Sequence, residues 1–223
     1  MGAFLTRVEL NPRRTLTARL VRNRRMLRGE VLAAFPEQDL AGREGPGRVL
    51  WRLDRDDPRR LLLYCVSATR PDFSHLVERA GWPEAHTGFE TRDYSRLLDQ
   101  LTSGQSFAFR LTANPVHYGR VKPGEPTKRL GHVTAARQMR WLLERQDRLG
   151  IEIPLASSGE PDARVTRRER VSFTRDGDRV TLSVVTYEGR LSVVDPDRLR
   201  AALTSGVGHA RAYGCGLLTL AAL

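Results

Sequence analysis

Hydrophobic and polar residues alternate in some segments of the chain and follow helical spacing in others. Phe4–Leu10 alternates as a half-buried strand does, and Asn11-Pro12 ends it. From Thr15 to about Phe35 the apolar residues follow helical spacing, and Asn23 is a position where this helix can break in two. In the same half, the pattern predicts strands at 48–54, 61–66 and 106–113, and helices at 73–80 and 94–101.

The second half repeats this mixture of strands and helices. Thr134 is suited to cap a helix from Ala135 to Leu149. The Asp176-Gly177 pair predicts a hairpin after a basic strand, Arg164–Phe173. The remaining elements are strands at 179–185 and 189–194, a helix from 196 to about 203 that starts with proline, and a last strand after a glycine-rich stretch.

The order of elements predicts the fold class. The first half reads strand, helix, strand, strand, helix, strand, which is the ferredoxin-like βαββαβ plan that RNA-recognition domains also use. The chain therefore divides into an N-terminal ferredoxin-like domain at 1–115, a basic linker at 116–132 and a C-terminal α/β domain at 133–223. We expect an α+β protein, with 106–113 as the last strand of the first domain.

Charge changes this picture from a plain α+β protein to one with an anionic partner. The 223 residues include 37 Lys plus Arg against 26 Asp plus Glu, a formal net charge of +11. Almost all of the basic residues are arginine, because lysine occurs only at Lys122 and Lys128. A GC-rich genome would explain arginine in place of lysine, but it would not explain the net charge. Guanidinium forks match phosphate oxygens, so the composition favours a nucleic-acid partner.

The cysteines and the termini place the chain in a reducing compartment. Cys65 and Cys215 both lie in apolar strand-like runs without metal-ligand spacing, so we expect buried, reduced thiols and neither a metal site nor a cofactor. No signal peptide or membrane-length apolar run is visible, and we expect a cytoplasmic protein without a membrane partner.

Two stretches are candidates for phosphate binding. Seven arginines fall between Arg13 and Arg28, a density that repels itself unless an anion lies against it. The last stretch, 206–216, holds four glycines around Arg211, which could form a loop whose N–H groups hold an anion. The same glycines could instead serve as a turn that lets the last strand enter a sheet.

Several of these segments resemble the CasE family, the repeat-RNA endoribonucleases of type I-E CRISPR systems. The resemblance runs through the whole chain in order. Its segments are 11–12 (Asn-Pro), 47–53 (Gly-Arg-Val-Leu-Trp-Arg-Leu), 110–115 (Arg-Leu-Thr-Ala-Asn-Pro), 187–191 (Tyr-Glu-Gly-Arg-Leu), 193–196 (Val-Val-Asp-Pro) and the terminal glycine run. The resemblance implies two tandem ferredoxin-like domains, binding of a repeat stem-loop, cleavage at the base of the stem, and retention in the Cascade complex.

The resemblance also implies a metal-independent reaction in which a ribose 2′-OH attacks the adjacent phosphate and leaves a 2′,3′-cyclic phosphate. A histidine of the family usually follows a methionine on the first helix, and Met26-Leu27 is the matching pair here. Leu27 cannot transfer a proton, and Arg24 stands where the family often has tyrosine. His209, inside the glycine run, is the candidate substitute. We expect residue 27 to face the RNA, with Met26 on the apolar side.

Two functions remain open after this comparison of residues. The chain either cleaves precursor CRISPR RNA, or it binds the stem-loop without cutting it, as an RNA-binding subunit. The residues expected to bind RNA are Arg13, Arg14, Arg24, Arg25, Arg28, Arg120, Lys122, Lys128, Arg129, Arg164, Arg167, Arg168, Gly206, Gly208, Arg211 and Gly214.

Overall fold

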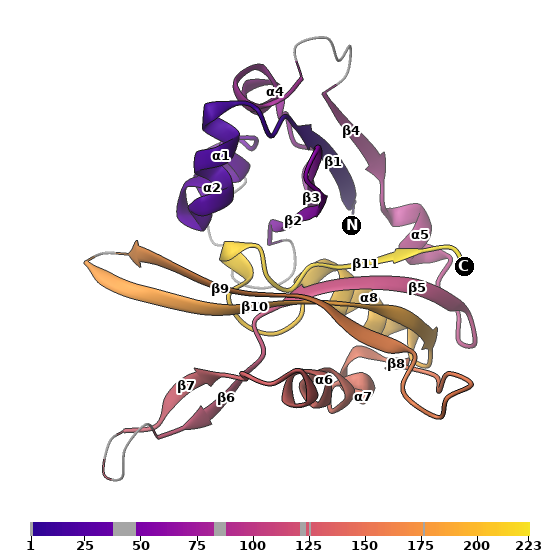
Figure 1. Ribbon diagram of the computed structural model, residues 1–223. Coiled ribbons are helices and arrows are strands. Elements are labelled where there is room, and N and C mark those ends of the chain that lie inside the picture. Colours follow the sequence, from indigo (N-terminus) through magenta and orange to yellow (C-terminus); the bar gives the residue numbers. More distant parts are fainter. Residues whose placement is uncertain (1, 38–47, 83–87, 121–123, 125, 176) are drawn as a thin grey trace.

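The computed structural model describes residues 2–37, 48–82, 88–120, 124, 126–175 and 177–223. They form two antiparallel sheets, each with its helices, and a separate two-stranded hairpin (Figure 1). The expected α+β class with two tandem ferredoxin-like units is confirmed. None of the helices described is long and apolar enough to cross a membrane.

The first sheet has the order β2-β3-β1-β4, which is the ferredoxin-like strand order. Asn23 separates its first two helices as expected, because its side-chain oxygen accepts hydrogen bonds from the backbone N–H groups of Arg25 and Met26. The elements are β1 (Phe4–Leu10), α1 (Thr15–Arg22), α2 (Arg24–Leu32), β2 (Leu50–Asp57), β3 (Arg60–Ser67), α4 (Ser74–Ala80), β4 (Phe89–Asp93) and α5 (Ser95–Asp99).

The second sheet has β5 (Ser106–Ala113) at its centre. Its backbone order is β11-β5-β10, with β8 and β9 both pairing with β10. One long strand, β10, replaces the two strands expected at 179–185 and 189–194, and the helix expected from Ala135 to Leu149 is divided into α6 and α7. The elements are α6 (Ala135–Leu143), α7 (Gln146–Leu149), β8 (Ile151–Glu152), β9 (Ala163–Arg175), β10 (Asp178–Val193), α8 (Pro196–Ser205), η1 (Arg211–Tyr213, one 3₁₀ turn) and β11 (Leu218–Ala221).

The position of β5 corrects the expected assignment of Ser106–Ala113. This strand pairs with β10 and β11 and starts the second ferredoxin-like unit, while β4, at Phe89–Asp93, completes the first. The strand signal in β4 is weak because this edge strand carries mainly charged and polar residues. Where the domains divide as folding units stays a prediction, and the pairing favours a boundary between β4 and β5.

The expected basic linker contains paired strands. Strands β6 (Val116–Gly119) and β7 (Lys128–Gly131) form an antiparallel hairpin that projects from the body of the molecule (Figure 1). Tyr118 and Arg129 lie directly opposite each other in it. The pairing of the two strands therefore fixes where these two side chains lie.

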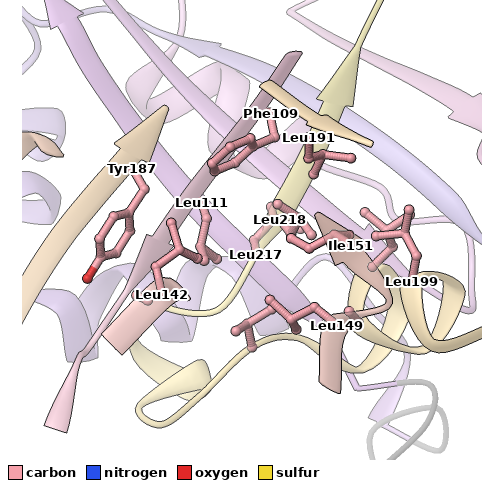
Figure 2. Packing of buried hydrophobic residues seen from close by; sticks show 14 of the residues in the cluster. Phe109, Leu111, Leu142, Leu149, Ile151, Tyr187, Leu191, Leu199, Leu217 and Leu218 are labelled. Carbon is pink, nitrogen blue, oxygen red and sulfur yellow. The ribbon is translucent and has the colours of Figure 1, made fainter. Parts of the chain in front are cut away.

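Most buried apolar residues fall into two clusters, besides a smaller third that includes Phe173 and Cys215. One lies inside the first unit and includes Leu20, Leu27 and Leu63. The other fills the second unit, where Leu111, Tyr187 and Leu218 pack against the helices (Figure 2), and it also includes Leu50 of β2. Because one cluster contains residues of both sheets, the two units share buried surface.

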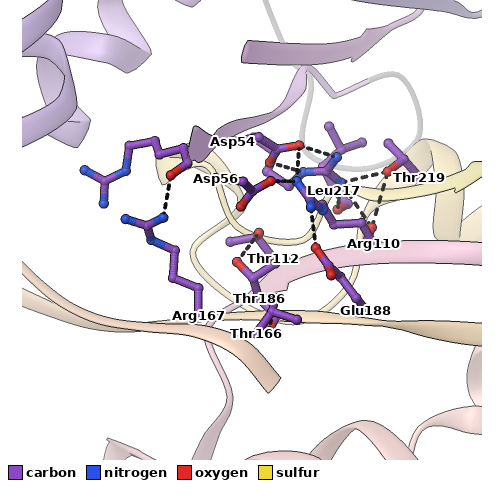
Figure 3. Close-up of polar contacts among 12 residues, drawn as sticks. Asp54, Asp56, Arg110, Thr112, Thr166, Arg167, Thr186, Glu188, Leu217 and Thr219 are labelled. Carbon is purple, nitrogen blue, oxygen red and sulfur yellow. Dashed lines mark hydrogen bonds and ion pairs between the residues drawn. The ribbon is translucent and has the colours of Figure 1, made fainter. Parts of the chain in front are cut away.

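A polar contact joins the same two units. The buried Arg52 of β2 binds Asp54 through two nitrogens, at 2.7 and 3.0 Å, and donates to the carbonyl oxygens of Arg110 and Leu217 in the second sheet. Arg110 in turn forms ion pairs with Asp54, Asp56 and Glu188 (Figure 3). Each buried charge has partners, which is the condition for burying it without a large cost.

Candidate nucleic-acid interface

Arginines of the first unit are presented by α1, α2 and the turn before α1. Arg13 is exposed and its backbone N–H is held by the side chain of Asn11 at 2.9 Å, while Arg14 is half-buried at the start of α1. On α2, Arg25 and Arg28 are exposed and lie one turn apart, on one side of the helix.

Strand β9 supplies a second row of arginines. Exposure alternates along it, as expected for a strand with one face toward solvent, and Arg164, Arg168 and Arg170 fall at exposed positions. Arg25 reaches from α2 to β9, where its guanidinium donates to the carbonyl oxygen of Thr174 at 3.5 Å. Arg168 and Arg170 lie on the other face of β9, toward the segment at 132–133, where Arg168 donates to the Val133 carbonyl oxygen. It is therefore the backbone of β9 that meets Arg25.

A charged cluster lies beneath this contact and fixes its geometry. Glu169 on β9 forms ion pairs with Arg24, Arg55 and Arg167, and Arg167 also donates to the carbonyl oxygen of Arg55 at 2.7 Å. Burial by itself would raise the pKa of Glu169, but the hydrogen bond from Arg167 and the charges of Arg55 and Arg24 hold that pKa below its usual value. The cluster ties α2, β2 and β9 together.

Arg24 belongs to that buried cluster, not to an RNA-facing surface as expected. It is 4% exposed and lies over the Trp51 ring, with 5.8 Å between the guanidinium carbon and the ring centre. Burial lowers the pKa of Arg24, opposed by its interaction with Cys215 and Glu169. Arg167 is also paired with Glu169, but 41% of its side-chain surface stays exposed, so it can still reach a ligand.

Leu27 is placed differently from the expectation. Its side chain has no exposed surface and packs in the first unit's apolar cluster with residues such as Leu20 and Val31. A residue in this position cannot reach RNA. The exposed residue next to it is Arg28, while Met26 is half-buried. The expectation that residue 27 faces outward while Met26 packs on the apolar side therefore does not match the burial of this helix.

The glycine stretch packs closely against β2 and α2. Positive φ angles occur at Gly206, Gly208 and Gly214, as a chain-reversing loop requires. A Cβ at Gly214 would lie 2.4 Å from Trp51 and 2.8 Å from Arg24. Several N–H groups that an anion nest would need donate within the protein, including those of 206, 207, 213, 214 and 216. Arg211 donates to the carbonyl oxygen of Ser205 at 2.6 Å.

His209 lies beside the basic hairpin, on the rim of a hollow. Its Nδ1 is 3.3 Å from an Arg129 nitrogen. Burial and the charges of Arg129, Arg211, Arg145 and Arg148 lower its pKa, which favours the neutral form of the ring. A neutral imidazole among four arginines is a competent hydrogen-bonding group.

The remaining residues expected to bind RNA lie on or near the hairpin. Arg120 and Lys128 are exposed there, and Lys122 lies outside the described residues. The sequence interpretation missed Arg55, Arg145, Arg148 and Glu169. Arg145 and Arg148 lie in a Glu-Arg-Gln-Asp-Arg run at the end of a helix, which reads as an ordinary solvated face.

Comparison with known proteins gives matches over nearly the whole chain. The family model described as CRISPR associated protein matches residues 3–222. The CRISPR-associated endoribonuclease Cse3 of Thermus thermophilus is 30% identical, covering 98% of this chain and 99% of its own length. The CRISPR system Cascade subunit CasE of Escherichia coli K12 is 29% identical, covering 78% of this chain and 89% of its own.

Solved structures agree with these sequence matches. Thermus thermophilus Cse3 bound to an RNA representing a pre-cleavage complex superposes with a TM-score of 0.80 at 30% identity, covering 99% of this chain and 100% of that one. Cse3 bound to a 19-nucleotide RNA has a TM-score of 0.77 at 29% identity, with the same coverage. Both chains share this arrangement of two units along their full length.

Proposed function

The chain belongs to the CasE/Cse3 family of CRISPR-associated proteins, and from this membership we propose that it binds the stem-loop of a CRISPR repeat RNA. Relatives of the same length are named as endoribonucleases and have been solved with RNA bound. The observation that carries the proposal is the basic surface where α2 meets β9, to which Arg25, Arg28 and Arg167 contribute beside the contact between Arg25 and Thr174.

Recognition in this proposal is by shape and charge. Arg25 and Arg28 of α2 and Arg167 of β9 form a surface that spans both units, with Arg13 and Arg14 at its α1 end. The exposed Arg168 and Arg170 lie on the opposite face of β9. A paired stem offers phosphates and 2′-hydroxyls more readily than base edges, and arginine forks fit the phosphates. The charged cluster around Glu169 holds α2 against β9 and so fixes this surface.

Cleavage by the family's chemistry would follow a balanced path. The 2′-oxygen forms a bond to the phosphorus while its proton passes to a base. The bond from phosphorus to the leaving 5′-oxygen breaks, and that oxygen takes up a proton, which gives a 2′,3′-cyclic phosphate and a 5′-hydroxyl. Arg25 and Arg28 can stabilise the developing negative charge, but arginine stays protonated and cannot act as the base.

A second candidate function follows from that limit. The exposed positions of α2 that face β9 carry arginine and no histidine, which favours a subunit that binds the stem-loop tightly and cuts slowly or not at all. His209 stays a candidate for the base because its lowered pKa favours the neutral ring. By analogy with the relative named as a Cascade subunit, we propose that the chain remains with the RNA in Cascade.

One experiment tests both functions. Purified protein is mixed with a labelled repeat stem-loop or with an unpaired RNA of the same composition, in the presence of EDTA. We expect preferential binding of the stem-loop, with any product carrying a cyclic phosphate. Equal affinity for the two RNAs would refute the binding proposal, whereas rapid cleavage would reject the non-cutting alternative.

A further inference from the structure

A basic hollow of about 340 Å³ lies between α7, α8 and the loop at 206–209. Figure 1 shows α6 and α7 on the side of the second sheet away from α1 and α2. The hollow is therefore separate from the α2–β9 surface. Four arginines and a histidine supply its basic lining: Arg145, Arg148, Arg198, Arg211 and His209.

Three of these four arginines lack an acidic partner. Arg198 is paired with Asp147 at 2.8 Å. Among the residues that the structure describes, no carboxylate lies within ion-pair distance of Arg145, Arg148 or Arg211. Like charges that gather without counter-charges repel one another, and a bound anion relieves that repulsion.

The unpaired arginines lie close enough to act on the same groups. Burial lowers the pKa of His209, and the charges of Arg211, Arg145 and Arg148 lower it further. Burial and the charges of Arg48 and Arg148 also lower the pKa of Arg211. These cations therefore surround one space, and an anion placed in it interacts with all of them.

Two of these arginines are held in place by neutral groups. Arg145 lies over the Trp141 ring, 4.1 Å from its centre, and donates to the Trp141 carbonyl oxygen at 2.7 Å. Arg211 is bound to the Ser205 carbonyl oxygen. A guanidinium has more N–H donors than these contacts use, so donors remain for an anion. Cations fixed before binding lose little conformational entropy when the anion arrives.

The hollow also has an apolar wall. Leu149, Ala202 and Val207 line it beside the arginines. Its volume is at the lower end of the range for small-molecule pockets, which is about 300–1,000 Å³. Fixed cations next to an apolar wall are typical of a site for a small organic phosphate, since a bare inorganic ion gains nothing from apolar contact.

We propose that this hollow binds a small organic diphosphate of the size of a free nucleoside diphosphate. Its phosphates lie against the guanidinium groups of Arg145, Arg148 and Arg211, whose forks match phosphate oxygens. Its organic part lies against Leu149 and Val207. The proposal does not rest on the binding of RNA, because the ligand is a free small molecule and the hollow lies away from the α2–β9 surface.

Calorimetric titration of three probes tests the proposal. The probes are adenosine diphosphate (ADP), pyrophosphate and adenosine, all in EDTA and at constant ionic strength. The proteins are wild type, Arg148→Gln and the control Arg140→Gln. Arg140 is exposed on α6 and does not line the hollow, so its substitution removes the same charge from a neighbouring helix.

We expect ADP to bind wild type and Arg140→Gln equally, and Arg148→Gln about tenfold more weakly, because a hydrogen bond to a charged group is lost. Pyrophosphate should bind more weakly than ADP, and adenosine should not bind measurably. Failure of ADP to bind wild type, or equal affinities of the two variants, would overturn the proposal. Pyrophosphate that binds as tightly as ADP would show that the apolar wall contributes nothing, and would refute an organic ligand.

A further titration separates the free ligand from the phosphates of RNA. ADP is added to wild type that has been saturated with a repeat RNA carrying its unpaired flanks. We expect the same affinity for ADP as without RNA, whereas loss of ADP binding would show that RNA fills the hollow and would overturn the proposal. If the protein binds no repeat RNA, the proposed function fails, and the titrations without RNA still decide whether the hollow binds the diphosphate.

Discussion

Burial of one side chain decides which residue of α2 can take part in chemistry. Leu27 is enclosed with Leu20 and Val31, whereas Arg28 is exposed at the neighbouring position. A helix turns about 100° per residue, so adjacent residues face different environments. From the sequence alone, either residue fits the position after an apolar one. Only the packing of the first unit distinguishes them.

This difference gives a matched pair of substitutions. Arg28→His should place an imidazole on the surface beside Arg25 and raise EDTA-resistant cleavage of the stem-loop by about 10²–10⁴-fold, because general acid–base catalysis contributes that much. Leu27→His buries an imidazole in an apolar cluster and should lower the free energy of unfolding by about 2–4 kcal/mol without a gain in cleavage. Single-turnover cleavage and denaturant unfolding measure the two effects.

The opposite outcome would support the expectation from the sequence, in which residue 27 faces the RNA. If Leu27→His folds well and cuts the RNA while Arg28→His does not, residue 27 faces the RNA and the packing of α2 described above is wrong. Equal inactivity of both well-folded variants would place the base outside α2, and His209→Ala is then the variant to measure.

Gly214 carries a second prediction at this scale. Its φ is +77°, and an added Cβ would meet Trp51 and Arg24 at less than 3 Å. Gly104 has a φ of +86° but open space around it, so Gly104→Ala reports the backbone penalty alone, about 1–2 kcal/mol. Gly214→Ala should cost about 1–3 kcal/mol more in denaturant unfolding, since the overpacking adds to the penalty. Equal losses would show that the loop does not pack against β2.

The residues that sequence reasoning could find share a local signal. Asn23 was predicted as a position where the first helix can break in two, and its side chain caps the second of the two helices. Both cysteines were predicted to be buried from their apolar neighbours, and both are. Arg24 and Leu27 were misplaced because their surroundings come from β2, β9 and the glycine loop, which are distant in sequence.

At the scale of elements, hydrophobic periodicity and turn residues predict where a strand lies in the sequence better than they predict which strand it pairs with. The strand at 106–113 was predicted with its observed bounds, but its place in the second sheet depends on pairing with β10 and β11. The charged edge strand β4 gave little alternation, so the next clear strand took its place in the predicted order. The alternation of hydrophobic residues along one strand does not specify which other strand pairs with it.

Strand β9 carries a prediction about pH. The lowered pKa of Glu169 means that its carboxylate stabilises the fold above the unfolded-state pKa, and that this stabilisation is lost as pH falls through the folded-state pKa. Glu169→Gln should therefore cost about 1.5–3 kcal/mol at pH 7, and the difference from wild type should shrink below about pH 4.5. Chemical unfolding at several pH values measures it.

Glu90→Gln is the control for that measurement. Glu90 also has a lowered pKa, due first to its hydrogen bond from Arg92, but it lies exposed on β4. Its substitution should change stability less than that of Glu169 at pH 7, because water screens exposed pairs. A pH-independent loss in Glu169→Gln would mean that its shape, not its charge, holds the contact.

At the scale of the whole molecule, two separate contacts keep the units in one arrangement. Arg52 is bound by groups of both sheets, and the Glu169 cluster joins α2 to β9. The arginine surface exists only while both contacts hold, because its rows come from different units. The sequence predicted the charge and the two units, but their relative placement depends on these buried pairs.

That surface leads to a prediction for the protein as a whole. The net charge of +11 and the exposed arginines on α2 and β9 should make stem-loop affinity fall steeply with salt, since each phosphate contact releases condensed counterions. The logarithm of the affinity should fall linearly with the logarithm of the salt concentration. Arg28→Gln should reduce the slope by about 0.9, the contribution of one contact to a duplex.

Arg92→Gln removes the same charge from β4, outside the proposed surface, and is the control. Its slope should equal that of wild type, because the slope counts the phosphates that the protein contacts, and Arg92 lies outside the proposed contact surface. If both variants reduce the slope equally, attraction is diffuse and the α2–β9 surface is not the site of contact. A flat response in wild type would contradict phosphate recognition altogether, since arginine forks cannot bind a stem without displacing its cations.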